Sequence, residues 1–286
     1  FVAIAAVVLV WGVAWAVNGR PIAENRTLLK ALATQGDLQA TYNGFEKAIA
    51  YDTFGTQEVR EQLAQGASQI AQANIPVDMK QKFYTLASQQ MTLQAAESPL
   101  DARFPLFLGV LYDSFGDYKN GQIALEKAQE LSPNKQSIFY ERAQNAELQG
   151  QTQRSIDLYR QAFELDQNLR DPRIVYAAVL IRNSRAAEAD PILEPIIATG
   201  EAADQRILAA LVSIKDYARI VPIWNAYIAQ HPEDVQGFFT LAAVFYQEGD
   251  TARAIATLQE AVKAHPEVSG QVTEIIQKIQ SGAPVN

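Results

Sequence analysis

The sequence contains no cysteine and only two histidines, and these two absences limit the chemistry available to the chain. Without cysteine there can be no disulfide, no thiolate nucleophile and no cysteine-containing zinc site. His231 and His265 each directly precede a proline, at what we expect to be the ends of two helices. We predict that both imidazoles interact with the last helix carbonyls and that they lie too far apart to hold a metal together.

Positive charge is also scarce, because 24 Lys and Arg residues face 32 Asp and Glu residues, giving a net charge of -8. Such a surface repels phosphate backbones, so we expect no nucleic-acid partner. The sequence has no glycine-rich phosphate loop, and its serines lack a supply of histidine bases. Most carboxylates, such as Glu126 and Glu260, fall on faces that we expect to be solvated. We therefore predict no catalytic residue, cofactor or metal site in this chain.

The longest apolar run lies at the start of the sequence, where Phe1 to Val17 carry no charge. At about 1.5 Å per residue this run spans about 25 Å, slightly less than the hydrocarbon core of a bilayer. We predict a transmembrane helix over residues 1–18, shortened because the sequence was cut from a longer protein, and ended by residues 18–21 (NGRP). The alternatives are a signal peptide cleaved near residues 14–16, although no basic region precedes the run, and a buried core helix.

Basic residues follow the apolar run closely. Arg20, Arg26 and Lys30 are opposed only by Glu24. By the positive-inside rule, this bias leans toward a cytoplasmic side for the rest of the chain. We therefore predict a membrane protein whose later part leans toward the cytoplasm.

The rest of the chain shows no strand-like alternation and instead repeats at about 34 residues. A turn beginning with Gly116, Gly150 or Gly249 opens an amphipathic helix in three places. This spacing predicts five units that start near residues 102, 136, 170, 201 and 235. The eighth residue of each unit is small in four of five cases, as close contact between two helices requires: Gly109, Ala143, Ala177, Leu208 and Ala242.

These units resemble tetratricopeptide repeats, most clearly the units that start at Ala102 and Val235. The resemblance implies an all-α fold, a right-handed α-solenoid of helical hairpins with an N-terminal transmembrane helix. Two units depart from the pattern, because Ser184 and Lys215 replace the turn glycine. Pro191 and Pro195 (in the unit that starts at residue 170) imply a late helix start or a kink.

The segments around the five units are predicted to be helical as well. Residues 19–98 contain a degenerate repeat, at 27–51, and an irregular hairpin made of helices 57–73 and 77–97. Residues 99–267 hold the five units. Residues 268–286 provide a capping helix, which covers the last apolar face of a solenoid, and a frayed tail.

The resemblance implies a concave surface, lined by the first helix of each unit, that binds a peptide or a partner helix. The residues that we place on it are Leu106, Val110, Asp113, Tyr140, Gln144, Glu147, Ile174, Ala178, Ile181, Phe239, Ala243 and Tyr246. These places lack the Lys/Asn/Arg cluster with which some tetratricopeptide domains grip a C-terminal carboxylate. The alternative is that Tyr140, Phe239 and Tyr246 pack against the next repeat.

Two functions are compatible with this sequence. The first is a membrane-tethered scaffold that binds a protein partner. The second follows from residues 1–65, whose order of apolar helix, NGRP, short helix and TYNGFEKAIAYDTFGTQEVREQLAQ resembles the C-terminal end of O-antigen ligase-like bacterial membrane proteins with a tetratricopeptide extension. That resemblance implies a parent glycan transferase whose catalytic residues lie upstream of Phe1. About ten further apolar spans upstream would support this alternative.

Overall fold

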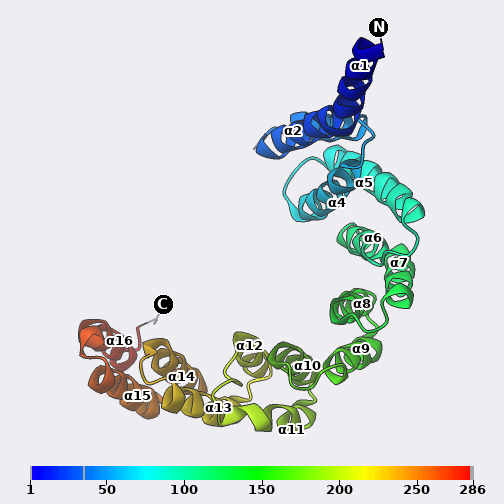
Figure 1. Ribbon diagram of the computed structural model, residues 1–286. Helices are drawn as coiled ribbons and strands as arrows, with labels where there is room; N and C mark the ends of the chain where they lie inside the picture. Colours follow the sequence, from blue (N-terminus) through cyan, green and yellow to red (C-terminus); the bar gives the residue numbers. More distant parts are fainter. Residues whose placement is uncertain (1, 35, 284–286) are drawn as a thin grey trace. The chain divides into compact units, whose positions relative to one another are not determined.

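The computed structural model describes residues 2–34 and 36–283, and these residues form helices joined by short loops, with no strand among them. The predicted all-α fold is confirmed. The chain divides into two compact units, Phe1–Leu158 and Tyr159–Asn286. In each unit, helices lie side by side in antiparallel pairs, the arrangement of an α-solenoid (Figure 1). The last residues of the predicted tail, 284–286, lie outside the described part of the chain.

The first unit contains three helical hairpins and the beginning of a fourth. The pairs α2 with α3, α4 with α5 and α6 with α7 are in contact, and α8 packs against both α6 and α7. In chain order its segments are α1 Val2–Ala14, the π-helical segment η1 Trp15–Gly19, α2 Arg20–Ala33, α3 Leu38–Ile49, α4 Thr56–Gln72, α5 Val77–Glu97, α6 Arg103–Ser114, α7 Tyr118–Leu131 and α8 Gln136–Leu148, with α9 Thr152–Glu164 crossing the division between the units.

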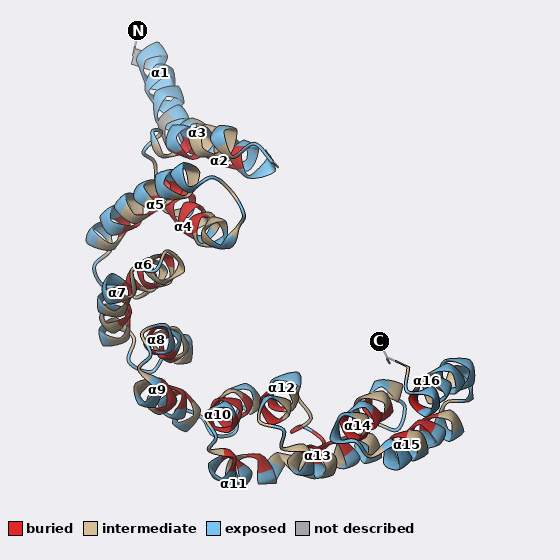
Figure 2. Ribbon diagram, turned by 180° about the vertical axis from the view of Figure 1, so that it is seen from behind, coloured by how far each residue is buried: buried red, intermediate tan, exposed pale blue. Residues whose placement is uncertain are grey.

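The N-terminal helix does not end at residues 18–21, so that prediction is wrong. The backbone at Gly19 and Arg20 stays right-handed helical, and α1 passes through the π-helical turn η1 directly into α2. Pro21 is compatible with this path, because the first turn of a helix needs no N–H from it. A Cβ on Gly19 would lie 2.3 Å from the Trp15 ring, so a larger residue there would require this ring, which is 66% exposed, to move. The π-turn coincides with a bend between α1 and α2, visible in Figures 1 and 2.

The first hairpin, α2 with α3, is held by close backbone contact and by an apolar core. A Cβ on Gly44 of α3 would lie 2.5 Å from the Cβ of Ala31, which shows how closely the two helices approach. Leu28 of α2 and Phe45 of α3 are 3% and 2% exposed and belong to one buried cluster with Phe83 of α5. Residues 20–49 therefore form a hairpin of the kind that the degenerate repeat predicts.

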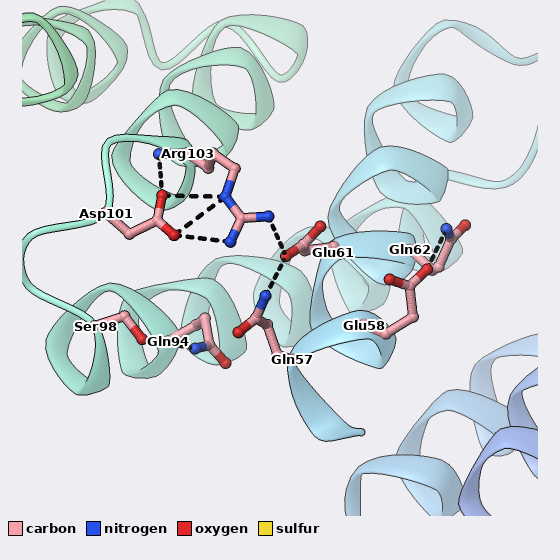
Figure 3. A network of polar contacts seen from close by, with 8 residues as sticks. All are labelled: Gln57, Glu58, Glu61, Gln62, Gln94, Ser98, Asp101 and Arg103. Atoms are coloured by element: carbon pink, nitrogen blue, oxygen red, sulfur yellow. Dashed lines mark hydrogen bonds and ion pairs between the residues drawn. The ribbon is translucent and has the colours of Figure 1, made fainter. Parts of the chain in front are cut away.

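A polar network joins the irregular hairpin to the first 34-residue unit (Figure 3). Arg103, at the start of α6, donates to both carboxylate oxygens of Asp101, and its Nη1 lies 3.7 Å from Oε1 of Glu61 on α4. Arg60, which is only 6% exposed, donates from Nη1 to Oε1 of Gln94 on α5 at 2.8 Å. The guanidinium of Arg60 also pairs with the carboxylate of Glu97 on α5, so this buried charge is neutralised and holds α4 against α5. The more exposed Arg103 links α6 to α4.

The second unit continues the hairpins and ends in a cap. Its helices are α10 Arg170–Arg182, α11 Ala186–Ile197, α12 Gln205–Ser213, α13 Tyr217–Gln230, α14 Val235–Glu248, α15 Thr251–Ala264, the 3-10 turn η2 Pro266–Val268 and α16 Ser269–Ser281. Val272 and Ile279 of α16 are buried against Ala242 of α14 and Leu258 of α15. The helix predicted as a cap therefore covers an apolar face of the last hairpin (Figure 2).

The turn between the paired helices has the same backbone form whether or not it contains glycine. Gly116, Gly150 and Gly249 have φ of 81°, 71° and 90°, in the left-handed region that glycine adopts freely. Ser184 and Lys215 occupy the equivalent places with φ of 60° and 59°. The turn therefore keeps its left-handed φ when glycine is absent. A residue with a Cβ in this conformation carries a conformational free-energy cost that glycine does not.

Helix α11 begins directly after its turn, at Ala186, so the predicted late start is wrong. Pro191 and Pro195 both lie inside this helix and are exposed. Pro222 occupies the same sixth position in α13 as Pro191 in α11, and it is exposed as well. In two successive hairpins of the second unit, the second helix therefore contains a proline at its sixth residue. Because proline has no backbone N–H, the helix loses one hydrogen bond there.

Candidate partner-binding site

The predicted groove residues of the first unit lie on α6 and α8. Gln144 and Glu147 are exposed. Leu106, Val110, Asp113 and Tyr140 are half-buried, so this face combines partly covered apolar groups with accessible polar ones. Because the chain divides into two compact units, the candidate residues of each unit are described separately.

Asp113 is the most perturbed carboxylate on the face of the first unit. Its Oδ1 accepts a hydrogen bond of 2.6 Å from Nδ2 of Asn145. Burial raises the pKa of Asp113 to about 6 despite that hydrogen bond, and Glu141 and Asp117 nearby raise the pKa further. Burial also raises the pKa of Glu141 above its ordinary value. Two carboxylates with raised pKa values, Asp113 and Glu141, therefore lie close together in this part of the first unit.

Asn145, the partner of Asp113, is not among the predicted groove residues, although the repeat pattern contains a signal for it. The tenth place of the other units is apolar and buried, occupied by Leu111, Val179, Ala210 and Val244. In the second repeat that place holds an asparagine, which is 2% exposed and also donates to the carbonyl oxygen of Tyr118 at 2.9 Å. A buried amide needs such partners, so the exception predicts a polar tie between neighbouring hairpins.

Aromatic residues flank this polar tie on the side of α5. The ring of Tyr84 lies tilted against Phe115, with 4.8 Å between the ring centroids, and edge-on to Tyr112 at 6.3 Å. Its hydroxyl donates to Oδ2 of Asp117 at 3.3 Å. Burial, reinforced by the Asp117 charge, raises the pKa of Tyr84 to about 12. The tyrosine therefore stays neutral and places an aromatic ring beside Asp117.

Three of the predicted groove residues of the second unit are not on an open surface. Ile174, Ala178 and Ile181 of α10 are 0%, 4% and 1% exposed. The physical reason is that α10 packs against both α11 and α12, so its face toward the expected groove is covered. The placement of these three residues on a partner-binding surface is therefore wrong.

The remaining three residues of the second unit line one hollow of about 340 Å³. Phe239, Ala243 and Tyr246 of α14 form one wall, and Ile275 and Ile279 of the cap α16 contribute to the other. Phe239 and Tyr246 are half-buried against this cap, while Ala243 is exposed. The amides that reach the hollow are Gln236, Gln247 and Gln271. An apolar slot rimmed by amides suits an apolar side chain of a peptide or a helix.

Among the described residues, the imidazoles of the two histidines do not contact the last carbonyls of their own helices in the way that the sequence predicts. Nε2 of His265 lies 2.7 Å from the carbonyl oxygen of Pro232, which follows helix α13 of the preceding repeat, and not at a carbonyl of its own helix. Nδ1 of His231 lies 3.5 Å from Oε1 of Glu233. Within residues 2–34 and 36–283, no group of three or more His, Asp or Glu side chains is placed to hold a metal ion.

The N-terminal segment Ala3–Ala33 is the one helix among the described residues that is long and apolar enough to cross a membrane. A signal sequence or a core helix can meet the same criteria of length and composition. The most apolar stretch of this helix is 0% buried, and large side chains such as Leu9 and Trp11 are 69% and 71% exposed. The described side chains of that stretch are therefore left uncovered by the rest of the described chain.

Comparison with known families identifies repeats at two of the predicted positions. The tetratricopeptide repeat family matches residues 106–135 and residues 236–267. These segments correspond to α6 with α7 and to α14 with α15. No curated protein sequence matches the chain.

Several solved structures resemble the chain at low identity. A tetratricopeptide repeat protein from Parabacteroides merdae is 11% identical, with a TM-score of 0.49, over 90% of this chain and 98% of its own. YrrB, described as a tetratricopeptide protein with an unusual peptide-binding site, is 16% identical with a TM-score of 0.41, over 65% and 97%. The pilF protein of Pseudomonas aeruginosa is 12% identical with a TM-score of 0.43, over 93% and 100%. Likenesses of this size do not bear on function.

Proposed function

Because this chain is a tetratricopeptide repeat protein, we propose that it is a scaffold that binds a protein or peptide partner while its N-terminal helix tethers it to a membrane. The observation that carries the proposal is the hollow between α14 and α16. Its wall contains Phe239, Ala243 and Tyr246, which the repeat pattern assigns to the binding face. Burial of an apolar anchor in such a slot supplies most of the binding energy of a typical interface.

The tether is supported by the length, composition and exposure of Ala3–Ala33. Burying exposed apolar side chains in a bilayer removes them from water, which stabilises the inserted state by about 25 cal/mol for each Å². The alternative hypothesis, that the chain is the extension of an O-antigen ligase-like glycan transferase, stays a prediction. The coding region upstream of Phe1 provides its test.

A photo-crosslinking experiment tests the binding face directly. The amino acid p-benzoylphenylalanine replaces Ala243, which is exposed beside the hollow, or Gln259, which is exposed on α15 and does not line it. We expect illumination of the full chain in native membranes to yield a discrete adduct from position 243 and none from position 259. Identical adducts from both positions would show that capture does not depend on the hollow.

A binding measurement with the captured protein, once purified, completes the test. Ala243→Arg places a long charged side chain at the mouth of the hollow, and Gln259→Arg adds the same side chain to the control face. We expect Ala243→Arg to weaken binding by about tenfold or more, because loss of an apolar anchor typically costs over 1.4 kcal/mol. Binding by Gln259→Arg should match that of the unmodified chain. Equal affinity for both variants would contradict the proposal.

A further inference from the structure

Helix α2 exposes an outer face that combines apolar and basic residues. Its inner face is buried in the first unit through Pro21, Glu24, Leu28 and Ala31. On the outside, Ile22, Leu29 and Leu32 are 51%, 58% and 46% exposed. Arg26 and Lys30 are exposed as well. Arg26 lies four residues after Ile22 and three before Leu29, and Lys30 lies four residues after Arg26, so these residues share the uncovered side of the helix.

The charge on this outer face has one sign. Glu24 is the only carboxylate of α2, and it points inward, where its Oε1 accepts a hydrogen bond of 2.6 Å from the hydroxyl of Thr56. It is 1% exposed. Arg26 and Lys30 form no ion pair with any described residue. A positive face therefore stands out on a chain whose net charge is -8.

The position of α2 along the chain connects this face to the apolar N-terminal helix. α1 continues through the π-turn into α2 without a loop, and the bend between them turns α2 away from the axis of α1 (Figures 1 and 2). Phe54, which is 79% exposed, lies beside Val17 and Ile22 at the junction and lines a hollow of about 310 Å³ with them. Apolar surface thus extends from the N-terminal helix onto the outer face of α2.

We propose that the outer face of α2 lies on the surface of an anionic lipid bilayer, with Ile22 and Leu29 in the interfacial region and Arg26 and Lys30 on lipid phosphates. The inference rests on the proposed membrane tether. An amphipathic helix with an apolar stripe and basic flanks binds such an interface in two ways. Its apolar side chains are buried among the lipids, and its basic side chains are attracted to the anionic headgroups. The lipid surface would then fix the orientation of the first unit, since the inner face of α2 is part of its core.

Because the chain lacks cysteine, single cysteines allow site-specific spin labelling of the full chain. Leu29→Cys reports on the outer face of α2, and Leu9→Cys reports on the tether. Leu148→Cys, at a leucine that is 45% exposed on α8, serves as the control away from the membrane helix. Each labelled chain is reconstituted into vesicles of phosphatidylcholine and phosphatidylglycerol. Collisions of the label with apolar oxygen and with a water-soluble nickel chelate are then measured.

We expect position 29 to resemble position 9, with high oxygen accessibility and low chelate accessibility, and position 148 to show the reverse. If position 9 is buried in lipid while position 29 is as open to the chelate as position 148, the inference about α2 fails and the tether stands. If position 9 itself is open to the chelate, the tether fails. Shielding of position 29 from both reagents would mean that protein covers α2, which also overturns the inference.

The basic residues are tested in the same vesicles. Arg26→Gln combined with Lys30→Gln should raise chelate accessibility at position 29 to the value that the unmodified chain shows in pure phosphatidylcholine vesicles. The matched control, Lys119→Gln combined with Lys135→Gln, changes two exposed lysines elsewhere in the first unit and should leave position 29 unchanged. Unaltered protection in the Arg26 and Lys30 variant would contradict the role given to anionic lipid.

Discussion

The hairpins that match the tetratricopeptide family differ from the two hairpins between residues 170 and 230 in how they are stabilised. The hairpins α6/α7 and α14/α15 carry glycine in the left-handed turn. The hairpins α10/α11 and α12/α13 carry Ser184 and Lys215 in that turn, and a proline at the sixth place of each second helix. Both kinds form the same antiparallel pair, so the motif residues are helpful to the fold and are not indispensable.

Burial compensates where the motif is lost. In α10, the consecutive residues from Tyr176 to Ile181 are all buried, which requires contact on every side of the helix. In α6, only one face is buried, through residues that include Phe104, Leu108 and Leu111. The cost of a strained turn is therefore offset by apolar area removed from water, at about 25 cal/mol for each Å².

The largest expected effect comes from removing this compensation. Leu180→Ala, at a side chain that is 0% exposed, should lower the free energy of unfolding by about 2–5 kcal/mol through lost burial and a cavity. Denaturant unfolding of the chain in detergent provides the measurement, followed by the fluorescence of Trp224, a buried residue of α13. Ile123→Ala, at an α7 side chain that is 66% exposed, should change stability by less than about 0.5 kcal/mol. Similar losses in the two variants would contradict compensation by burial.

The next effect concerns the glycines of the motif. Gly116→Ala and Gly249→Ala each force a Cβ into the left-handed conformation and should cost about 1–2 kcal/mol. Gly66→Ala is the matched control, because Gly66 lies inside α4, where an added Cβ meets no atom within 4 Å. That variant should gain about 0.5–1 kcal/mol from helix propensity. Losses of equal size at all three glycines would show that left-handed geometry is not the cause.

Asn145 of α8 stands where the other units carry an apolar residue, and its hydrogen bond to Asp113 ties α8 to the matching hairpin α6/α7. This pair predicts a pH effect. The pKa of Asp113 is raised from 3.8 to about 6, so the folded state binds this proton more tightly than the unfolded state. The stability that the protonated carboxyl contributes is complete below about pH 4 and is lost as the pH rises through about 6. Each pKa unit corresponds to about 1.4 kcal/mol, and solvent screening of this half-buried group reduces the net effect to about 1–2 kcal/mol.

Asp113→Asn removes that ionisation while keeping an acceptor for Asn145. The variant should unfold at higher denaturant concentration than the unmodified chain at pH 8 and at the same concentration at pH 4. Asp113→Ala, which also removes the acceptor, should be destabilised at both pH values, because the buried amide loses a partner. An Asp113→Asn effect that is equal at both pH values would rule out titration of this carboxyl as its cause.

Much of the fold was predictable because the 34-residue period places turns and helix starts by simple spacing. The close approach at Gly109, where a Cβ would lie 2.4 Å from Cγ of Leu125, follows from the small residue required at the eighth place. The continuous helix through Gly19 was not predictable, since a π-helical turn leaves no signal distinct from that of a helix end.

The candidate site was less predictable than the fold. The repeat pattern places residues on a helix face but does not determine what covers that face. The face that carries Ile174 is buried because α10 also packs against α12. The hollow beside Phe239 depends on the cap α16, which belongs to no repeat.

The smallest expected effect reverses the sign of the glycine substitutions. Ser184→Gly and Lys215→Gly should each raise the free energy of unfolding by about 0.5 kcal/mol. Glycine removes the Cβ that disfavours the left-handed conformation, but it also increases the conformational entropy of the unfolded chain, and the two effects partly cancel. Ser213→Gly, at the last residue of α12, is the control and should be destabilising, because that position is helical. A gain at Ser184 and Lys215 together with a loss at Ser213 would mean that the two divergent hairpins retain the conformational demand of the motif. Losses at all three positions would mean instead that their turns have adapted fully to the residues they now contain.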